Sequence, residues 1–208
     1  MPMKKNLLLF GAAGAVAMVA TAFVAVDRAN AGGRMLVKFA PGTMQPVFAG
    51  PAGSGATNYV LDYKVTNAAD AALKPGVRLE LRTETKMTFG DSYDAGTWKA
   101  AKERLGAKED LSSAATIRST ELAGGASVNG LANFGTIDNN ADKFEVRVYG
   151  LWDPVYRDRQ GRTWAEKRVL VLSYSRSGDE YDRQLDPIHL DSVKEELEGE
   201  ATQLHTAN

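Results

Sequence analysis

The sequence contains no cysteine and only two histidines, His189 and His205. Without cysteine the chain forms no disulfide, thiolate metal site, iron–sulfur cluster or cysteine nucleophile, and it lacks the lipidated cysteine of a bacterial lipoprotein. Two histidines give little support to a His-rich metal site or to histidine-based catalysis. The 25 basic and 26 acidic residues give a formal charge of −1. Because no broad basic field is present, we expect no general nucleic-acid binding.

The rest of the composition is that of one soluble domain. The chain has 208 residues, of which 44% are hydrophobic and 25% are charged, and these shares differ from those of a collagen, a disordered chain or a disulfide scaffold. No phosphate loop is present, because the glycine-rich stretch 50–55 lacks the Gly-Lys-Ser/Thr ending. Nothing in the sequence indicates a cofactor.

The N-terminal 31 residues have the layout of a secretory signal peptide. Lys4 and Lys5 precede an uncharged run over 7–26, and a small-x-small site ends at Ala31. No twin arginine is present, which favours the general secretion route. The alternative is an uncleaved anchor, since 20 uncharged residues just span a hydrocarbon core of about 30 Å. Both alternatives place the remainder outside the cytoplasm, in the periplasm or the extracellular space, and only the second attaches it to the membrane.

The remainder divides into three parts. Residues 32–57 form a Gly/Pro-rich lead-in with a short strand over 35–39, and residues 58–190 form the main domain. In that domain, apolar and polar residues alternate over 59–65 and 77–81, which predicts strands with one buried face. The buried residues are expected to be Tyr59, Leu61, Tyr63, Val65, Val77, Leu79 and Leu81.

Two helices are expected. The first covers 97–105 and ends at Gly106, a residue that favours a left-handed helix end. The second is an acidic helix within the C-terminal part, 191–208, where Ser192 and Glu195 form a capping-box pattern. Further strands are expected over 116–122, 131–137, 143–151 and 163–174, which with the lead-in strand makes about seven.

This pattern predicts a mainly β fold, a two-layer antiparallel sandwich with a short crossover helix and a C-terminal helix. The run Asp138-Asn139-Asn140-Ala141-Asp142-Lys143-Phe144-Glu145-Val146-Arg147-Val148-Tyr149 resembles the E–F corner and F strand of immunoglobulin-like and fibronectin-III-like modules. The resemblance covers about residues 120–175 and implies an immunoglobulin-like β-sandwich. Phe144 stands where those families often place a tyrosine, so the corner hydrogen bond is missing and no functional residue is carried over. The runs 129–135 and 150–151 are also similar to secreted bacterial sandwich proteins of unassigned function.

The most concentrated candidate binding surface is a hairpin with its tip at Gln160-Gly161. Flat aromatic rings beside guanidinium forks suit a sugar, an anionic glycan or a protein partner. The candidate binding residues are Trp152, Tyr156, Arg157, Arg159, Arg162 and Trp164. The alternative is structural: the tyrosine and the second tryptophan pair across the hairpin, and the arginines pair with Asp153 and Asp158.

Two acidic patterns are weaker candidates. Asp138, Asn140 and Asp142 have the oxygen spacing that starts a calcium loop, but Lys143 stands where that loop requires glycine. A polar turn accounts for them better. The second pattern is the set of carboxylates that a hydrolase would need in pairs, namely Asp91, Asp94, Asp179, Glu180, Asp182 and Asp186.

The sequence therefore predicts an exported, non-enzymatic β-sandwich that serves as a binding or assembly module of the cell envelope. Its partner is expected to be a protein or glycan of the envelope. One alternative is a secreted hydrolase with two carboxylates converging in a pocket. The other is a single-span accessory subunit of a membrane complex, which requires residues 7–26 to remain as an anchor.

Overall fold

A computed structural model describes residues 33–49, 56–106, 110–137, 140–176 and 188–204. Within these ranges the chain is mainly β, with eleven strands in antiparallel sheets and two helices. The predicted mainly β class is confirmed. The strand number exceeds the expected seven, partly because the segment 163–174 divides into two strands, β8 and β9.

A three-stranded sheet has the order β1–β2–β5, formed by β1 (Val37–Ala49), β2 (Ala56–Asn67) and β5 (Ser127–Asn133). The expected lead-in strand over 35–39 is present but longer than predicted, because β1 begins at Val37 and runs for 13 residues. Pro41 and Gly42 fit into this strand because its register with β2 shifts between Pro41 and Met44, and a bulge on an edge strand tolerates both residue types. The Asp62 carboxylate fixes the bulge by accepting a 2.9 Å hydrogen bond from the Thr43 N–H.

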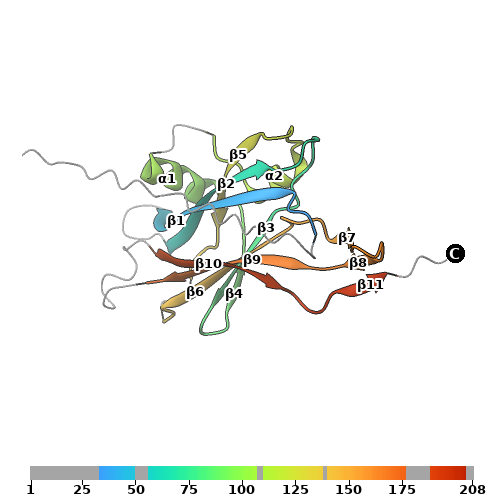
Figure 1. Ribbon diagram of the computed structural model, residues 1–208. Coiled ribbons are helices and arrows are strands. Elements are labelled where there is room, and N and C mark those ends of the chain that lie inside the picture. The colour runs from blue at the N-terminus through green and yellow to red at the C-terminus, as the bar shows by residue number, and fades with distance from the viewer. Residues whose placement is uncertain (1–32, 50–55, 107–109, 138–139, 177–187, 205–208) are drawn as a thin grey trace, which may run out of the picture.

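A five-stranded sheet has the order β10–β9–β6–β3–β4 (Figure 1). Its strands are β3 (Arg78–Thr83), β4 (Thr88–Gly90), β6 (Lys143–Tyr149), β9 (Arg168–Ser175) and β10 (His189–Leu197). The two sheets enclose one hydrophobic core, which gives a sandwich-like packing. Every side chain that the alternating pattern placed inside is buried there. Val60, which the alternating pattern assigned to the exposed face of its strand, is also buried, because α1 covers the other face of the three-stranded sheet.

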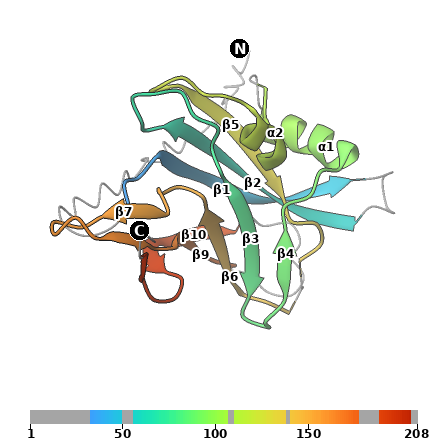
Figure 2. The ribbon, with the colours of Figure 1, turned by 90° about the vertical axis from the view of Figure 1, so that its right-hand side faces the viewer.

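Helix α1 (Ala95–Leu105) confirms the expected first helix (Figure 2). The Asp94 carboxylate caps its start by accepting a 2.7 Å hydrogen bond from the Thr97 N–H. Gly106 ends it in the left-handed conformation, with φ of 59°. Trp98 and Ala101 face the three-stranded sheet and pack on Val47, Val60 and Leu131.

The strand expected over 116–122 is wrong, because helix α2 (Ala114–Ser119) occupies most of that segment. The Ser113 hydroxyl accepts a 3.1 Å hydrogen bond from the Thr116 N–H and caps the helix. Ala114 and Ile117 lie three residues apart and are both buried in the core. Helical spacing of two buried residues therefore outweighs the β propensity of the threonines in this segment.

The expected C-terminal helix is also wrong, because the segment forms β10 and then β11 (Thr202–Leu204). β10 pairs along the full length of β9, so it satisfies a row of backbone groups that a helix would leave open. Its pattern suits a strand, with Val193 against the core and Lys194 and Glu196 on the outer face. Gly199 has φ of 88° in the link between the two strands.

A third sheet, made of three short strands, extends the structure at one end. Strands β7 (Val155–Arg157), β8 (Thr163–Ala165) and β11 form it, in the order β11–β8–β7. β8 leads into β9, and β10 leads into β11, so this sheet projects from the end of the sandwich away from α1 (Figure 1). We call these three strands, together with the loop 158–162 that joins β7 to β8, the arm.

Candidate functional site

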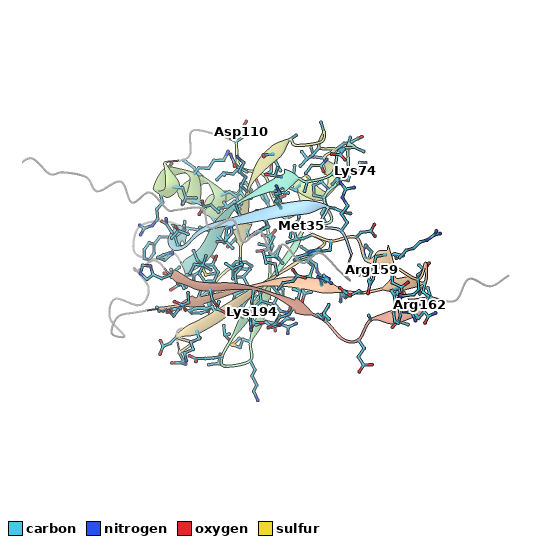
Figure 3. All side chains as sticks on the ribbon, in the orientation of Figure 1. Met35, Lys74, Asp110, Arg159, Arg162 and Lys194 are labelled. Atoms are coloured by element: carbon cyan, nitrogen blue, oxygen red, sulfur yellow. The ribbon has the colours of Figure 1, made fainter. Side chains whose placement is uncertain are left out.

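The arm brings together five of the six candidate binding residues. Tyr156 lies directly opposite Trp164 and Arg157 lies opposite Thr163, so the predicted cross-strand pair is confirmed. Arg159 and Arg162 lie at the far end of the molecule from α1 (Figure 3). The sixth residue, Trp152, is 8% exposed in the sandwich core and forms a backbone bridge with Met35. Trp152 therefore has a packing role and offers little surface to a partner.

Asp158 organises the hairpin tip. Its carboxylate accepts hydrogen bonds from the backbone N–H groups of Gln160 and Arg162, both at 2.9 Å. It also accepts bonds from the Arg162 Nε at 2.6 Å and the Trp164 Nε1 at 3.0 Å. Desolvation raises the pKa of Asp158, but these bonds from Trp164 and Arg162 outweigh it and lower the pKa to about 2. The predicted pairing of an arginine with Asp158 is thus confirmed for Arg162.

The other two arginines of the tip have no such partner. Arg157 and Arg159 are exposed, and neither forms an ion pair or hydrogen bond with any residue that the structure describes. The tip has a formal charge of +2, because it carries three arginines, Arg157, Arg159 and Arg162, and one carboxylate, that of Asp158. The tip therefore combines a fixed backbone with two guanidinium forks that remain available to a ligand.

Buried charged groups hold the arm to the sandwich. The Arg168 guanidinium pairs with Glu166, which lies between β8 and β9, and with Glu195 on β10. Tyr156 donates a hydrogen bond to Glu166, and desolvation together with the charge of Glu166 raises the pKa of Tyr156. Because this network joins β7, β9 and β10, it fixes the direction in which the arm projects.

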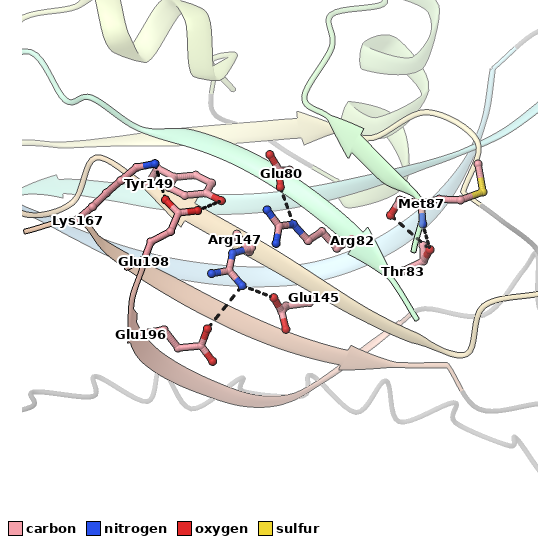
Figure 4. Close-up of polar contacts among 10 residues, drawn as sticks. All are labelled: Glu80, Arg82, Thr83, Met87, Glu145, Arg147, Tyr149, Lys167, Glu196 and Glu198. Atoms are coloured by element: carbon pink, nitrogen blue, oxygen red, sulfur yellow. Dashed lines mark hydrogen bonds and ion pairs between the residues drawn. The ribbon is translucent and has the colours of Figure 1, made fainter. Parts of the chain in front are cut away.

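The charged outer face of the five-stranded sheet is largely neutralised within the protein (Figure 4). Arg82 pairs with Glu80 at 2.7 Å, and Arg147 pairs with Glu145 at 2.7 Å and with Glu196 at 3.5 Å. These alternating charges form a ladder of ion pairs, and they leave little net charge for a partner.

The calcium-loop pattern gains no support as a metal site. Asp138 lies outside the described residues, and the Asp142 N–H donates a 2.7 Å hydrogen bond to Glu84 in a polar turn. No group of three His, Cys, Asp or Glu residues within the described ranges can hold a metal ion. The acidic residues between 179 and 186 also lie outside the described residues.

A pocket of about 370 Å³ lies at the edge of the five-stranded sheet, beside α2. The sequence does not indicate this pocket, because its residues are scattered over β3, β4, the loop after β4 and α2, and only Asp91 among them was a candidate. They are Arg78, Leu79, Glu80, Thr88, Gly90, Asp91, Tyr93, Ser113, Ala115 and Arg118. Glu80 and Asp91 bring two acidic residues to its lining, and the hydrolase alternative would need such a pair to converge.

Comparisons with protein-family models, with curated proteins and with solved structures find no match. Within the described ranges, no helix has the length and apolar character needed to cross a membrane.

Proposed function

We propose that the protein is an exported, non-enzymatic binding module of the cell envelope, and that the tip of the arm contacts an anionic glycan or protein. The observation that carries this proposal is the pair of exposed arginines, Arg157 and Arg159, which have no partner among the described residues. A guanidinium group on this hairpin binds carboxylate or sulfate groups with little loss of backbone freedom, because the backbone around it is already ordered.

Two sequence-based expectations belong to this proposal. The immunoglobulin-like class of the sandwich is supported by the resemblance around β6 and by two antiparallel sheets sharing one core. Export is supported by the signal-peptide layout of residues 1–31. The N-terminal residue of the native protein tests export: Gly32 supports cleavage, and Met1 supports the anchored accessory subunit.

The hydrolase alternative has weaker support. Glu80 accepts a hydrogen bond from Arg82, and Asp91 accepts one from the Asn133 N–H at 2.9 Å. Burial raises the pKa of Asp91, while its bonds to backbone N–H groups and the charge of Arg118 lower it. Both carboxylates have partners within the protein, and the pKa of Asp91 is raised overall, so this pair gives the hydrolase alternative less support than the unpartnered arginines give to binding.

Retention on heparin resin, a model acidic glycan, tests the role of the arm. The variant Arg157→Gln/Arg159→Gln removes the free guanidinium groups and keeps Arg162 on Asp158. Its control, Lys99→Gln/Arg104→Gln, removes two exposed positive charges from α1, which lies at the other end of the molecule. The proposal predicts that the arm variant elutes at clearly lower salt than the control. Equal elution of the two variants would show that only net charge matters.

A further inference from the structure

The pocket beside α2 exists because β4 is shorter than its neighbour. β4 pairs with β3 only from Glu80 to Arg82 and ends at Gly90. The chain then crosses to the three-stranded sheet, where the Ser92 N–H donates to the Asn133 carbonyl at 2.9 Å. The edge of β3 before Glu80 is therefore left without a strand on this side. Helix α2 contributes Ala115 and Arg118 to the lining of this opening.

The acidic groups of this pocket are already engaged, as described above for Glu80 and Asp91. The basic groups are engaged only in part. Arg118 donates one hydrogen bond, from Nη1 to the Val77 carbonyl at 3.1 Å, and the guanidinium carbon of Arg78 lies 4.5 Å from the Tyr149 ring centre. A guanidinium group has five N–H donors in its plane, and stacking on a ring uses only its face. Neither arginine forms an ion pair with a described residue.

We propose that this pocket binds a small organic anion, whose carboxylate or phosphate group accepts hydrogen bonds from Arg78 and Arg118. Both groups match the planar fork of arginine and accept two parallel hydrogen bonds from it. The volume of about 370 Å³ is near the lower limit of ligand pockets, so it suits a molecule of about one ring rather than a polymer.

The rim of the pocket favours an anion that carries a flat ring. Tyr93 lines the pocket, and its side chain is 69% exposed. Its ring lies 5.4 Å from the ring of Trp98, in a tilted arrangement that holds it in place. An exposed, supported aromatic ring stacks readily on a sugar or on another aromatic ring. This site is separate from the arm and does not depend on the proposed function.

Chemical-shift mapping by NMR tests this site on the purified protein, because the method detects millimolar binding. Three probes are titrated: benzoate, inorganic phosphate and benzyl alcohol, the last being a neutral analogue of benzoate. We expect benzoate, phosphate or both to shift the amide signals of residues 78–80, 90–93 and 113–118. Benzyl alcohol is expected to bind at least tenfold more weakly than the better anion.

Two variants test which residues hold the anion. Arg78→Gln/Arg118→Gln removes both forks, and Ala115→Glu adds a negative charge to the lining without removing any contact of the folded protein. Each variant is expected to weaken binding of the anion at least tenfold. The second variant keeps the test valid if loss of the Arg118 bond to Val77 impairs folding. Arg104→Gln on α1 is the control and is expected to leave the affinity unchanged.

Binding of benzoate alone identifies a carboxylate ligand, binding of phosphate alone identifies a phosphorylated one, and binding of both supports the shared chemistry. Three results would overturn the proposal. These are the absence of shifts around the pocket with either anion, equal binding of benzyl alcohol, and unchanged affinity in folded Ala115→Glu.

Discussion

Replacing Arg168 with methionine tests whether a buried ionic network holds the arm. The Arg168, Glu166 and Glu195 side chains are only 14%, 6% and 22% exposed. Arg168→Met keeps most of the apolar stem but leaves two carboxylates without their cation. Removing one partner of a buried ion pair usually costs about 3–5 kcal/mol. This is a large share of the roughly 5–15 kcal/mol by which most domains are stable.

Urea unfolding measures this loss, with Arg82→Met as the matched control. Arg82 also pairs with a glutamate, Glu80, but its side chain is 43% exposed. An exposed pair contributes about 0–1 kcal/mol, so the control is expected to unfold close to the wild type. With a slope of about 1–3 kcal/mol per molar urea, Arg168→Met is expected to lower the midpoint by about 1 M or more.

A combined variant separates lost charge pairing from lost packing. Adding Glu166→Gln and Glu195→Gln to Arg168→Met removes the two orphaned charges and is expected to restore part of the stability. Equal midpoints for Arg168→Met and Arg82→Met would show that the network does not stabilise the arm. A combined variant less stable than Arg168→Met alone would also contradict the reasoning.

Three other predictions follow from the core, from one glycine and from the hairpin tip. Leu79→Asp buries an unpaired carboxylate and is expected to abolish cooperative unfolding by urea, whereas Glu80→Ala on the outer face is expected to change stability by about 1 kcal/mol or less. Gly150 has φ of 78° and a neighbouring carbonyl oxygen 2.1 Å from where a Cβ would lie, so Gly150→Ala is expected to lower the melting temperature by several degrees or more. The pKa of Asp158 in the folded protein lies below the usual value of 3.8. The contribution of this carboxylate to folding stability is therefore complete above about pH 4 and is lost as the pH falls toward 2. The indole N–H signal of Trp164 in NMR spectra is expected to shift with a midpoint near pH 2, and a midpoint near 4 would contradict the hydrogen-bonded tip.

The sequence was most informative where one physical constraint acts alone. Tyr59, Leu61, Tyr63 and Val65 alternate because one face of β2 packs on the core, and a period of two shows this directly. The end of α1 at Gly106 was equally readable, because a left-handed helix end favours glycine.

Tertiary contacts decided the elements that the sequence misplaced. Ser192 and Glu195 fit a capping box, but the open edge of β9 selects a strand there. In the candidate site, the sequence located the arginines and the opposed rings of the hairpin. It did not show that Trp152 belongs to the core or that Arg78 and Arg118 share a pocket, because those contacts join distant segments.

Mapping the bound surface shows directly whether the tip of the arm is the binding site. The measurement is an NMR titration of the purified protein with a short heparin oligosaccharide. The largest amide shifts are expected within residues 157–162, and the amides of α1 and of the outer face of β3 and β6 are expected to stay unchanged. Shifts centred on another face, or no shift at the tip under conditions where the oligosaccharide binds, would contradict it.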